Sequence, residues 1–180
     1  MVQRAMDELG WSDPIMGKGN REINARPVLV LRQHLMDWKL LRRSGGKLVL
    51  TPRGRRGLQR PGDLWDYMLE EIARPKHDAV KLTTRLYAEW HLSGIAPPFN
   101  RRVEVIRDAL VATGFVTRSG HPIPEQWAAE INQTVRASLG CLNLMTRAGS
   151  LQERARGKRA LLSDGGQKFL LEVQGLLEGQ

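Results

Sequence analysis

Apolar residues recur at spacings of three and four along most of this 180-residue chain. That spacing places the apolar side chains on one face of an α-helix. Breaks occur where glycine and proline cluster, which is typical of turns and loops. The pattern predicts helices over residues 2–9, 24–38, 52–60, 63–73, 78–92, 101–113, 125–140 and 164–177. The sequence therefore predicts a mainly α-helical protein.

Two segments share a different pattern, which predicts a β-hairpin followed by a helix. One begins at Leu40 and the other at Leu144. Each has an apolar pair, a basic polar stretch, a second apolar pair, a Thr or Ser, and a glycine three residues later. Apolar pairs around a polar turn are typical of two short strands, and Thr or Ser is a preferred helix N-cap. We expect antiparallel hairpins over residues 40–51 and 144–162, with Thr51 and Ser163 capping the helices that follow.

The first of these segments resembles the wing of the winged helix-turn-helix superfamily, which includes MarR-like and PadR-like regulators. The residues that carry the resemblance are Leu50-Thr51-Pro52-Arg53-Gly54, which match a Leu-Thr-x-x-Gly pattern at the end of a strand. The second segment departs from it, with Ser163-Asp164-Gly165 in place of Thr-Pro-Arg and with a longer hairpin. The first 75 residues also resemble modules of uncharacterised actinobacterial proteins, through Asn20-Arg21-Glu22 and Arg26-Pro27-Val28.

Together, the repeat and the resemblance imply a mainly α fold with short β-hairpins, arranged as two tandem winged helix-turn-helix modules. The best candidate for a boundary is Arg74-Pro75-Lys76, because proline there interrupts the helical pattern. We therefore expect an N-terminal module over residues 1–75 and a C-terminal module over residues 76–180.

Charge is the second informative property of the chain. Twenty-eight Lys and Arg residues against 19 Asp and Glu residues give a net charge of +9. The excess is concentrated, because residues 39–60 contain eight basic residues and no acidic residue. A further basic cluster lies inside the longer second hairpin. Clustered cations favour a polyanionic partner such as nucleic acid, with a merely solvated basic face as the alternative.

In a DNA-binding winged helix the wing supplies cations to phosphates, whereas the helix before it reads base edges in the major groove. The candidate phosphate-binding residues are Arg42, Arg43, Lys47, Arg53, Arg55, Arg56, Arg147, Arg154, Arg156, Lys158 and Arg159. The candidate base-reading residues, on the helix over residues 125–140, are Asn132, Gln133 and Arg136. Against base reading, Glu125 and Glu130 on the same helix would repel phosphate.

Other classes of function find little support in the sequence. The four histidines and Cys141 do not have metal-ligand spacing, so we expect no metal and no cofactor. His91 and Ser93 could be imagined as a hydrolytic pair, but their position at an apolar helix end favours a structural role.

A single cysteine, no apolar run of membrane-spanning length and no signal-peptide core predict a soluble cytoplasmic protein.

The sequence thus predicts a DNA-binding protein rather than an enzyme, with a function in transcriptional control and duplex DNA as its partner. The alternative is a winged-helix module that binds another protein within a larger assembly and does not read DNA. A homodimer or a partner protein remains open in either case.

Overall fold

The computed structural model of the chain describes residues 4, 7–8, 25–142, 144 and 162–179. Within these residues the protein is mainly helical, with one small antiparallel sheet of two strands. The expected class, mainly α with a short β-hairpin, is therefore confirmed at this coarse level.

The chain divides into two compact units. The first comprises Met1–Met68 with Cys141–Asn143, and the second comprises Leu69–Gly140 with Leu144–Gln180. The division falls inside a helix, α4 (Pro61–Ala73), rather than at the short link over residues 74–76 that follows it.

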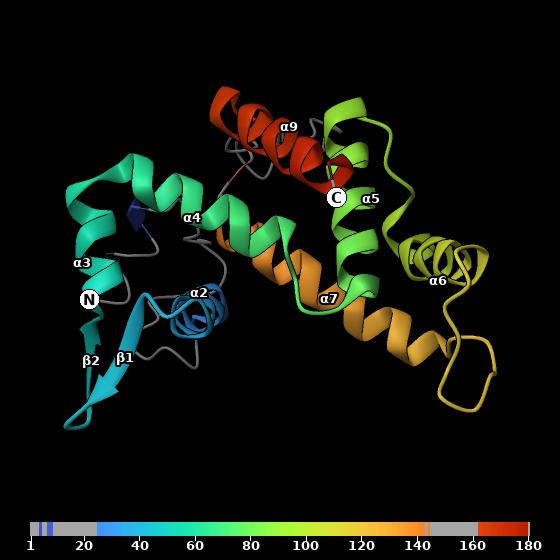
Figure 1. Cartoon of the computed structure of the whole chain (residues 1–180), viewed down its shortest axis with the longest axis horizontal. Coiled ribbons are helices and arrows are strands. Elements are labelled where there is room, and N and C mark those ends of the chain that lie inside the picture. The colour runs from blue at the N-terminus through green and yellow to red at the C-terminus, as the bar shows by residue number, and fades with distance from the viewer. Residues whose placement is uncertain (1–3, 5–6, 9–24, 143, 145–161, 180) are drawn as a thin grey trace. The chain divides into compact units, whose positions relative to one another are not determined.

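The N-terminal unit has the order helix, hairpin, helix, helix (Figure 1). Its elements are α2 (Arg26–Asp37), β1 (Leu41–Ser44), β2 (Lys47–Leu50), α3 (Pro52–Gln59) and the first part of α4. Pro61 and Gly62 were expected to lie in a break before α4, but they form its first turn. Proline is tolerated there because the first backbone N–H groups of a helix have no partner within the helix.

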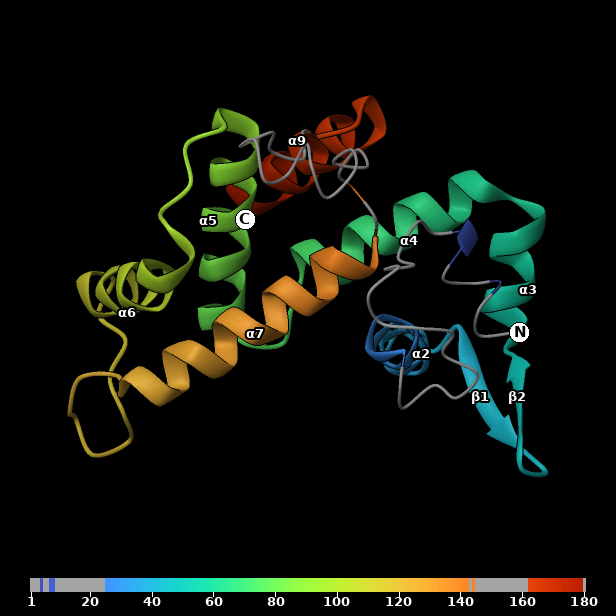
Figure 2. The same cartoon turned by 180° about the vertical axis from the view of Figure 1, so that it is seen from behind.

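The predicted hairpin at residues 40–51 is confirmed. Leu41 pairs with Leu50 and Ser44 pairs with Lys47 in an antiparallel register, and Gly45 and Gly46 form the two-residue loop. Both glycines have positive φ, 55° and 73°, which side chains with a Cβ rarely adopt. In both views the hairpin projects beyond α2 and α3 of its own unit (Figure 1 and Figure 2).

A polar turn joins the end of the hairpin to α3. Thr51 donates its backbone N–H to the Leu40 carbonyl at 3.0 Å and its hydroxyl to the Lys39 carbonyl at 2.7 Å. The same hydroxyl accepts the backbone N–H of Gly54 at 3.0 Å, so the predicted N-cap is confirmed. Gly54 is required here because a Cβ would overlap the carbonyl oxygen of Leu40.

The N-terminal unit has a small apolar core. Trp38 and Leu40, which follow α2, are buried together with Met68 of α4. The Tyr67 hydroxyl donates a hydrogen bond of 2.7 Å to the Trp38 carbonyl, which fixes α4 to the segment that enters the hairpin. The face of α3 that packs inward carries Gly54 and Gly57, and its charged side chains are left on the outside.

The C-terminal unit contains four α-helices within the described residues. They are α5 (Asp78–Ser93), α6 (Arg102–Ala112), α7 (Glu125–Cys141) and α9 (Asp164–Glu178), and a short 3-10 helix, η2 (Phe99–Arg101), precedes α6. Helix α9 lies beside α5 (Figure 1). The core is formed by α6, α7 and α9 residues of low exposure, among them Ile106, Leu110, Val135, Leu170 and Val173.

The buried face of α5 differs from the one that apolar spacing predicts. Leu82, Leu86 and Trp90 have helical spacing, but they are only half-buried. Thr83 and Thr84 are buried instead, together with Tyr87 and Ala88. Both threonines donate their hydroxyls to the carbonyl four residues earlier at 2.8 Å, which satisfies the polar group and allows burial.

The second predicted hairpin, residues 144–162, lies almost wholly outside the described residues. Its two ends are described, and they repeat the first turn. Ser163 donates its backbone N–H to the Leu144 carbonyl at 3.0 Å and its hydroxyl to the same oxygen at 2.8 Å. The Ser163 hydroxyl also accepts the N–H of Gly166 at 3.0 Å. The predicted cap at Ser163 is confirmed, and a Cβ on Gly166 would overlap the Leu144 carbonyl oxygen.

Among the described residues, no helix has both the length and the apolar character that crossing a membrane requires.

Candidate nucleic-acid interface

The sequence-predicted cations of the N-terminal unit are all exposed. Three lie on the hairpin and three on α3, and we refer to the six as the basic surface. Its members are Arg42, Arg43, Lys47, Arg53, Arg55 and Arg56. The face of α3 that carries Gly54 and Gly57 packs inward, and the hairpin projects from the unit. The fold therefore directs these six side chains to solvent.

The pleat of the hairpin divides its three cations between two faces. Successive side chains on a strand point to opposite faces, and paired residues share a face. Arg42 pairs with Val49, and Lys47 pairs with Ser44, so Arg42 and Lys47 lie on one face. Arg43 pairs with Leu48 and lies on the other. Arg42, Arg43 and Lys47 are therefore all exposed, and they are divided between the two faces of the hairpin.

On α3, Arg53 differs from its neighbours. Its guanidinium lies 4.3 Å from the centre of the Tyr67 ring, whose hydroxyl is already bonded to the Trp38 carbonyl. Such cation–π contacts contribute roughly 0.5–1 kcal/mol at exposed sites. Arg53 therefore has a packing function as well as a charge, whereas Arg55 and Arg56 have no recorded side-chain contact of this kind in the described structure.

Among the described residues of the unit, the charge of the basic surface is not neutralised. In the part of the chain that is described, none of its six residues forms a salt bridge with a carboxylate. The nearest acidic residue in sequence, Asp37, instead accepts a hydrogen bond of 3.0 Å from Gln33 on the same helix. An uncompensated cluster of this kind produces a positive potential that attracts polyanions.

In the C-terminal unit, Asn132 is not the surface residue that the sequence predicted. It is 7% exposed, and its side-chain oxygen accepts a hydrogen bond of 2.6 Å from the Tyr87 hydroxyl. Its position on the helix explains the burial. Asn132 lies four residues after Ala128 and three before Val135, so all three share the buried face of α7. Asn132 is thus a buried link between α5 and α7, and it is unavailable to a base edge.

The other two residues of the predicted base-reading patch are exposed but do not act with Asn132. Gln133 lies on the solvent side of α7. Arg136 is also exposed, and its guanidinium lies 4.6 Å from the centre of the Phe99 ring. The patch of three side chains therefore does not exist as one surface. The cations predicted in the second hairpin, Arg147, Arg154, Arg156, Lys158 and Arg159, lie outside the described residues.

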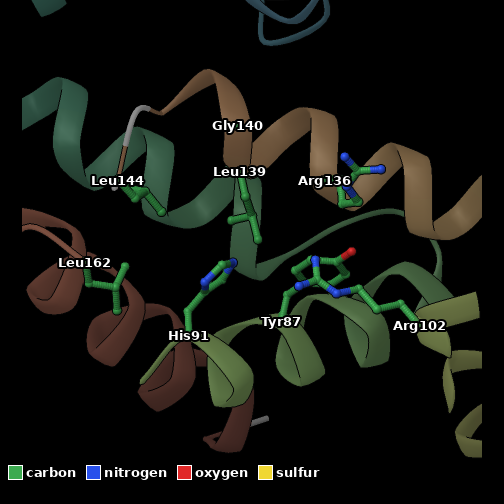
Figure 3. Close-up of a pocket in the computed structure, with 8 residues that line it drawn as sticks. All are labelled: Tyr87, His91, Arg102, Arg136, Leu139, Gly140, Leu144 and Leu162. Carbon is green, nitrogen blue, oxygen red and sulfur yellow. The ribbon is translucent and has the colours of Figure 1, made fainter. Parts of the chain in front are cut away.

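Sequence reasoning missed a cavity in the C-terminal unit. It is lined by Tyr87 and His91 of α5, Arg102 of α6 and Arg136 of α7, with leucines on the remaining side (Figure 3). His91 was assigned a structural role, yet its ring faces this space. Burial and the Arg102 charge lower the pKa of His91 below its usual 6.5. The sequence singled out Arg136 as a candidate site residue, but it could not show the cavity, because the lining residues come from four separate segments of the chain.

No cluster of histidine, cysteine, aspartate and glutamate side chains suitable for a metal ion occurs among the described residues. Burial raises the pKa of the Cys141 thiol to about 11, so the thiolate that metals and electrophiles require is scarce at neutral pH.

Comparison with known proteins gives no match: no protein-family model, no curated protein and no solved structure resembles this chain.

Proposed function

We propose that this protein binds duplex DNA through the basic surface of its N-terminal unit and acts in transcriptional control. In this proposal the unit works as a winged helix. The hairpin β1–β2 is the wing, and α2, which precedes it, takes the position of the recognition helix.

The observation that carries the proposal is the combination of charge and placement over residues 39–60. Eight basic residues occur there without an acidic residue. The six of the basic surface are exposed on a hairpin that projects from the unit and on the helix that follows it. A merely soluble surface mixes both signs of charge, whereas a surface for phosphate concentrates one sign.

The split of the hairpin cations between two faces is compatible with this use. A hairpin that enters a DNA groove is flanked by a phosphate backbone on each side. Arg42 and Lys47 would face one backbone, and Arg43 the other. Arg55 and Arg56 on α3 would extend the contact along the strand. Arg53 would contribute less, because it is stacked on Tyr67.

Fluorescence anisotropy with several short duplexes of unrelated sequence tests the proposal. The full chain should bind all of them with similar affinity, because phosphate contacts carry no sequence information. Changing Arg42, Arg43 and Lys47 together to Ala should weaken binding to every duplex by a similar factor. Changing Arg55 and Arg56 to Ala should weaken it in the same uniform manner, and Arg53→Ala should have a smaller effect.

The hairpin variant is suitable for this test because its three side chains are exposed and lack salt bridges within the described residues. Circular dichroism should show unchanged helix content. If the folded triple variant binds duplex DNA as well as the natural chain, the basic surface serves another purpose. A protein-interaction module, with exposed Leu48 and Leu58 beside the cations, would then be the better interpretation.

A further inference from the structure

The cavity of the C-terminal unit has two chemically different ends (Figure 3). At one end, Arg102 reaches from the start of α6 toward the Tyr87 ring, with its guanidinium 5.8 Å from the ring centre. Arg136 lines the same end from α7. At the other end, Leu139, Leu144 and Leu162 line the space. His91 lies between the two ends.

The cationic end carries uncompensated positive charge. Among the described residues, no Asp or Glu lines the cavity and neither arginine forms a salt bridge with a carboxylate. Arg102 donates its Nε–H to the Pro97 carbonyl at 3.2 Å, which fixes the guanidinium but leaves its charge unneutralised. The Tyr87 hydroxyl donates a hydrogen bond to Asn132 and also interacts with the Arg102 side chain. The positive charges of Arg102 and Arg136 both act on Tyr87, opposing the effect of burial, which raises its pKa.

The volume favours a small ligand. The pocket holds about 190 Å³ and is partly open to solvent. An apolar cavity of about 150 Å³ accepts a benzene ring, whereas drug-sized ligands occupy roughly 300–1,000 Å³. A single ring or a short hydrocarbon chain with one acid group therefore fits this volume. Two guanidinium groups are suited to a planar carboxylate, which can accept hydrogen bonds from both.

We propose that this cavity binds a small organic monocarboxylate, with its acid group between Arg102 and Arg136 and its hydrocarbon part against Leu139, Leu144 and Leu162. The proposal does not depend on DNA binding, because it concerns only residues of the C-terminal unit.

Isothermal titration calorimetry of the full chain with benzoate and with hexanoate tests this assignment. At least one of the two acids should bind with a Kd in the millimolar range or tighter. Benzamide, which has the shape of benzoate without its charge, should bind about tenfold more weakly or not at all, because hydrogen bonds to a charged group are the stronger ones. Inorganic phosphate, which lacks the hydrocarbon part, should also bind more weakly.

Two substitutions locate the binding. Arg136→Gln and Arg102→Gln should each weaken acid binding by about tenfold to a hundredfold, since each removes a charge-assisted contact. Arg118→Gln is the matched control, because Arg118 is exposed in the same unit and does not line the cavity. Arg136 is exposed, so its variant should fold even if Arg102→Gln, which loses the bond to Pro97, does not.

The proposal is overturned if neither acid binds, or if Arg136→Gln binds the acid as well as Arg118→Gln does. Equal affinity for benzoate and benzamide would exclude recognition of the carboxylate. Phosphate binding as tight as that of either acid would exclude a function for the leucine side.

Discussion

Thr51 and Ser163 occupy the same kind of turn in the two units, yet the described residues beside each turn differ. In both, a hydroxyl caps a helix, the backbone closes onto a leucine carbonyl, and a glycine stands three residues later. The N-terminal turn closes a short hairpin that projects into solvent with its cations. The C-terminal turn joins Leu144 to Ser163, and Leu144 and Leu162 beside it line a cavity.

This difference shows how little of a function such a turn specifies. The turn requires only a hydroxyl, a carbonyl and a glycine, and it fixes where a helix begins. The function depends on the side chains placed around it, and among the described residues these include exposed cations in one unit and the cavity-lining Leu144 and Leu162 in the other. Four experiments separate what the turns share from what distinguishes the units.

The largest effect should come from adding a methyl group to either turn glycine. In Gly54→Ala and Gly166→Ala the new Cβ would overlap a backbone carbonyl oxygen, which cannot move without breaking the cap. We expect each variant to lose about 3 kcal/mol in free energy of unfolding, at the upper end of the usual range for overpacked sites. Urea unfolding followed by circular dichroism measures the loss.

Neighbouring glycines provide the control for these variants. Gly62 and Gly165 also lie in the first turn of a helix, but a Cβ on either meets nothing within 4 Å. Gly62→Ala and Gly165→Ala should leave stability unchanged or raise it by up to about 1 kcal/mol, because alanine favours helix. Equal losses at Gly165 and Gly166 would contradict the shared geometry of the turns.

Removing the capping hydroxyls should have an intermediate effect. Thr51→Ala and Ser163→Ala leave the N–H of the turn glycine without its acceptor and should each cost about 1–2 kcal/mol. Thr51→Ser and Ser163→Thr retain the hydroxyl and should cost clearly less. Thermal melting of the four variants tests this, and a Ser163→Ala protein as stable as Ser163→Thr would argue against the second cap.

A smaller effect, expected in acid, should distinguish the two units. Burial lowers the pKa of His34 and of His91, so the unfolded chain takes up protons from about pH 6.5 downward before the folded chain does. Stability is therefore fully present above that pH and falls as the pH drops toward the lowered values. Asp37 opposes the shift at His34, whereas Arg102 adds to it at His91.

His91→Gln should therefore reduce the acid sensitivity of stability more than His34→Gln does. Melting temperatures compared at about pH 7.5 and about pH 5.5 provide the measurement. If His91→Gln loses as much stability between these two pH values as the natural chain does, the histidine is not buried as the structure has it.

Local signals predicted the features that depend on near neighbours in the chain. Gly45-Gly46 between apolar pairs predicted the first hairpin, and Thr51 and Ser163 predicted the starts of α3 and α9. Each of these depends on residues close in sequence, whose geometry has few alternatives. From residue 25 onward, the ends of the described helices were predicted within a few residues for the same reason, whereas the helix predicted over residues 2–9 lies largely outside the described residues.

Features that depend on distant contacts could not be predicted in this way. Asn132 seemed a surface residue because it is polar, and only its partner Tyr87, 45 residues away, explains its burial. Thr83 and Thr84 replaced leucines in the core because hydroxyls bonded to the preceding turn can be buried. The cavity needs side chains from α5, α6 and α7 together with Leu144 and Leu162, which no periodicity connects.

The salt dependence of DNA binding tests the central claim most directly. The logarithm of the association constant for a random duplex should fall linearly with the logarithm of salt concentration, and changing Arg42, Arg43 and Lys47 to Ala should reduce this slope by about two to three units. A matched triple variant of the C-terminal unit, with the exposed residues Arg74, Lys76 and Arg118 changed to Ala, removes the same charge and should leave the slope nearly unchanged. Equal reductions in the two triple variants, or none in the first, would contradict a DNA-binding surface on the hairpin.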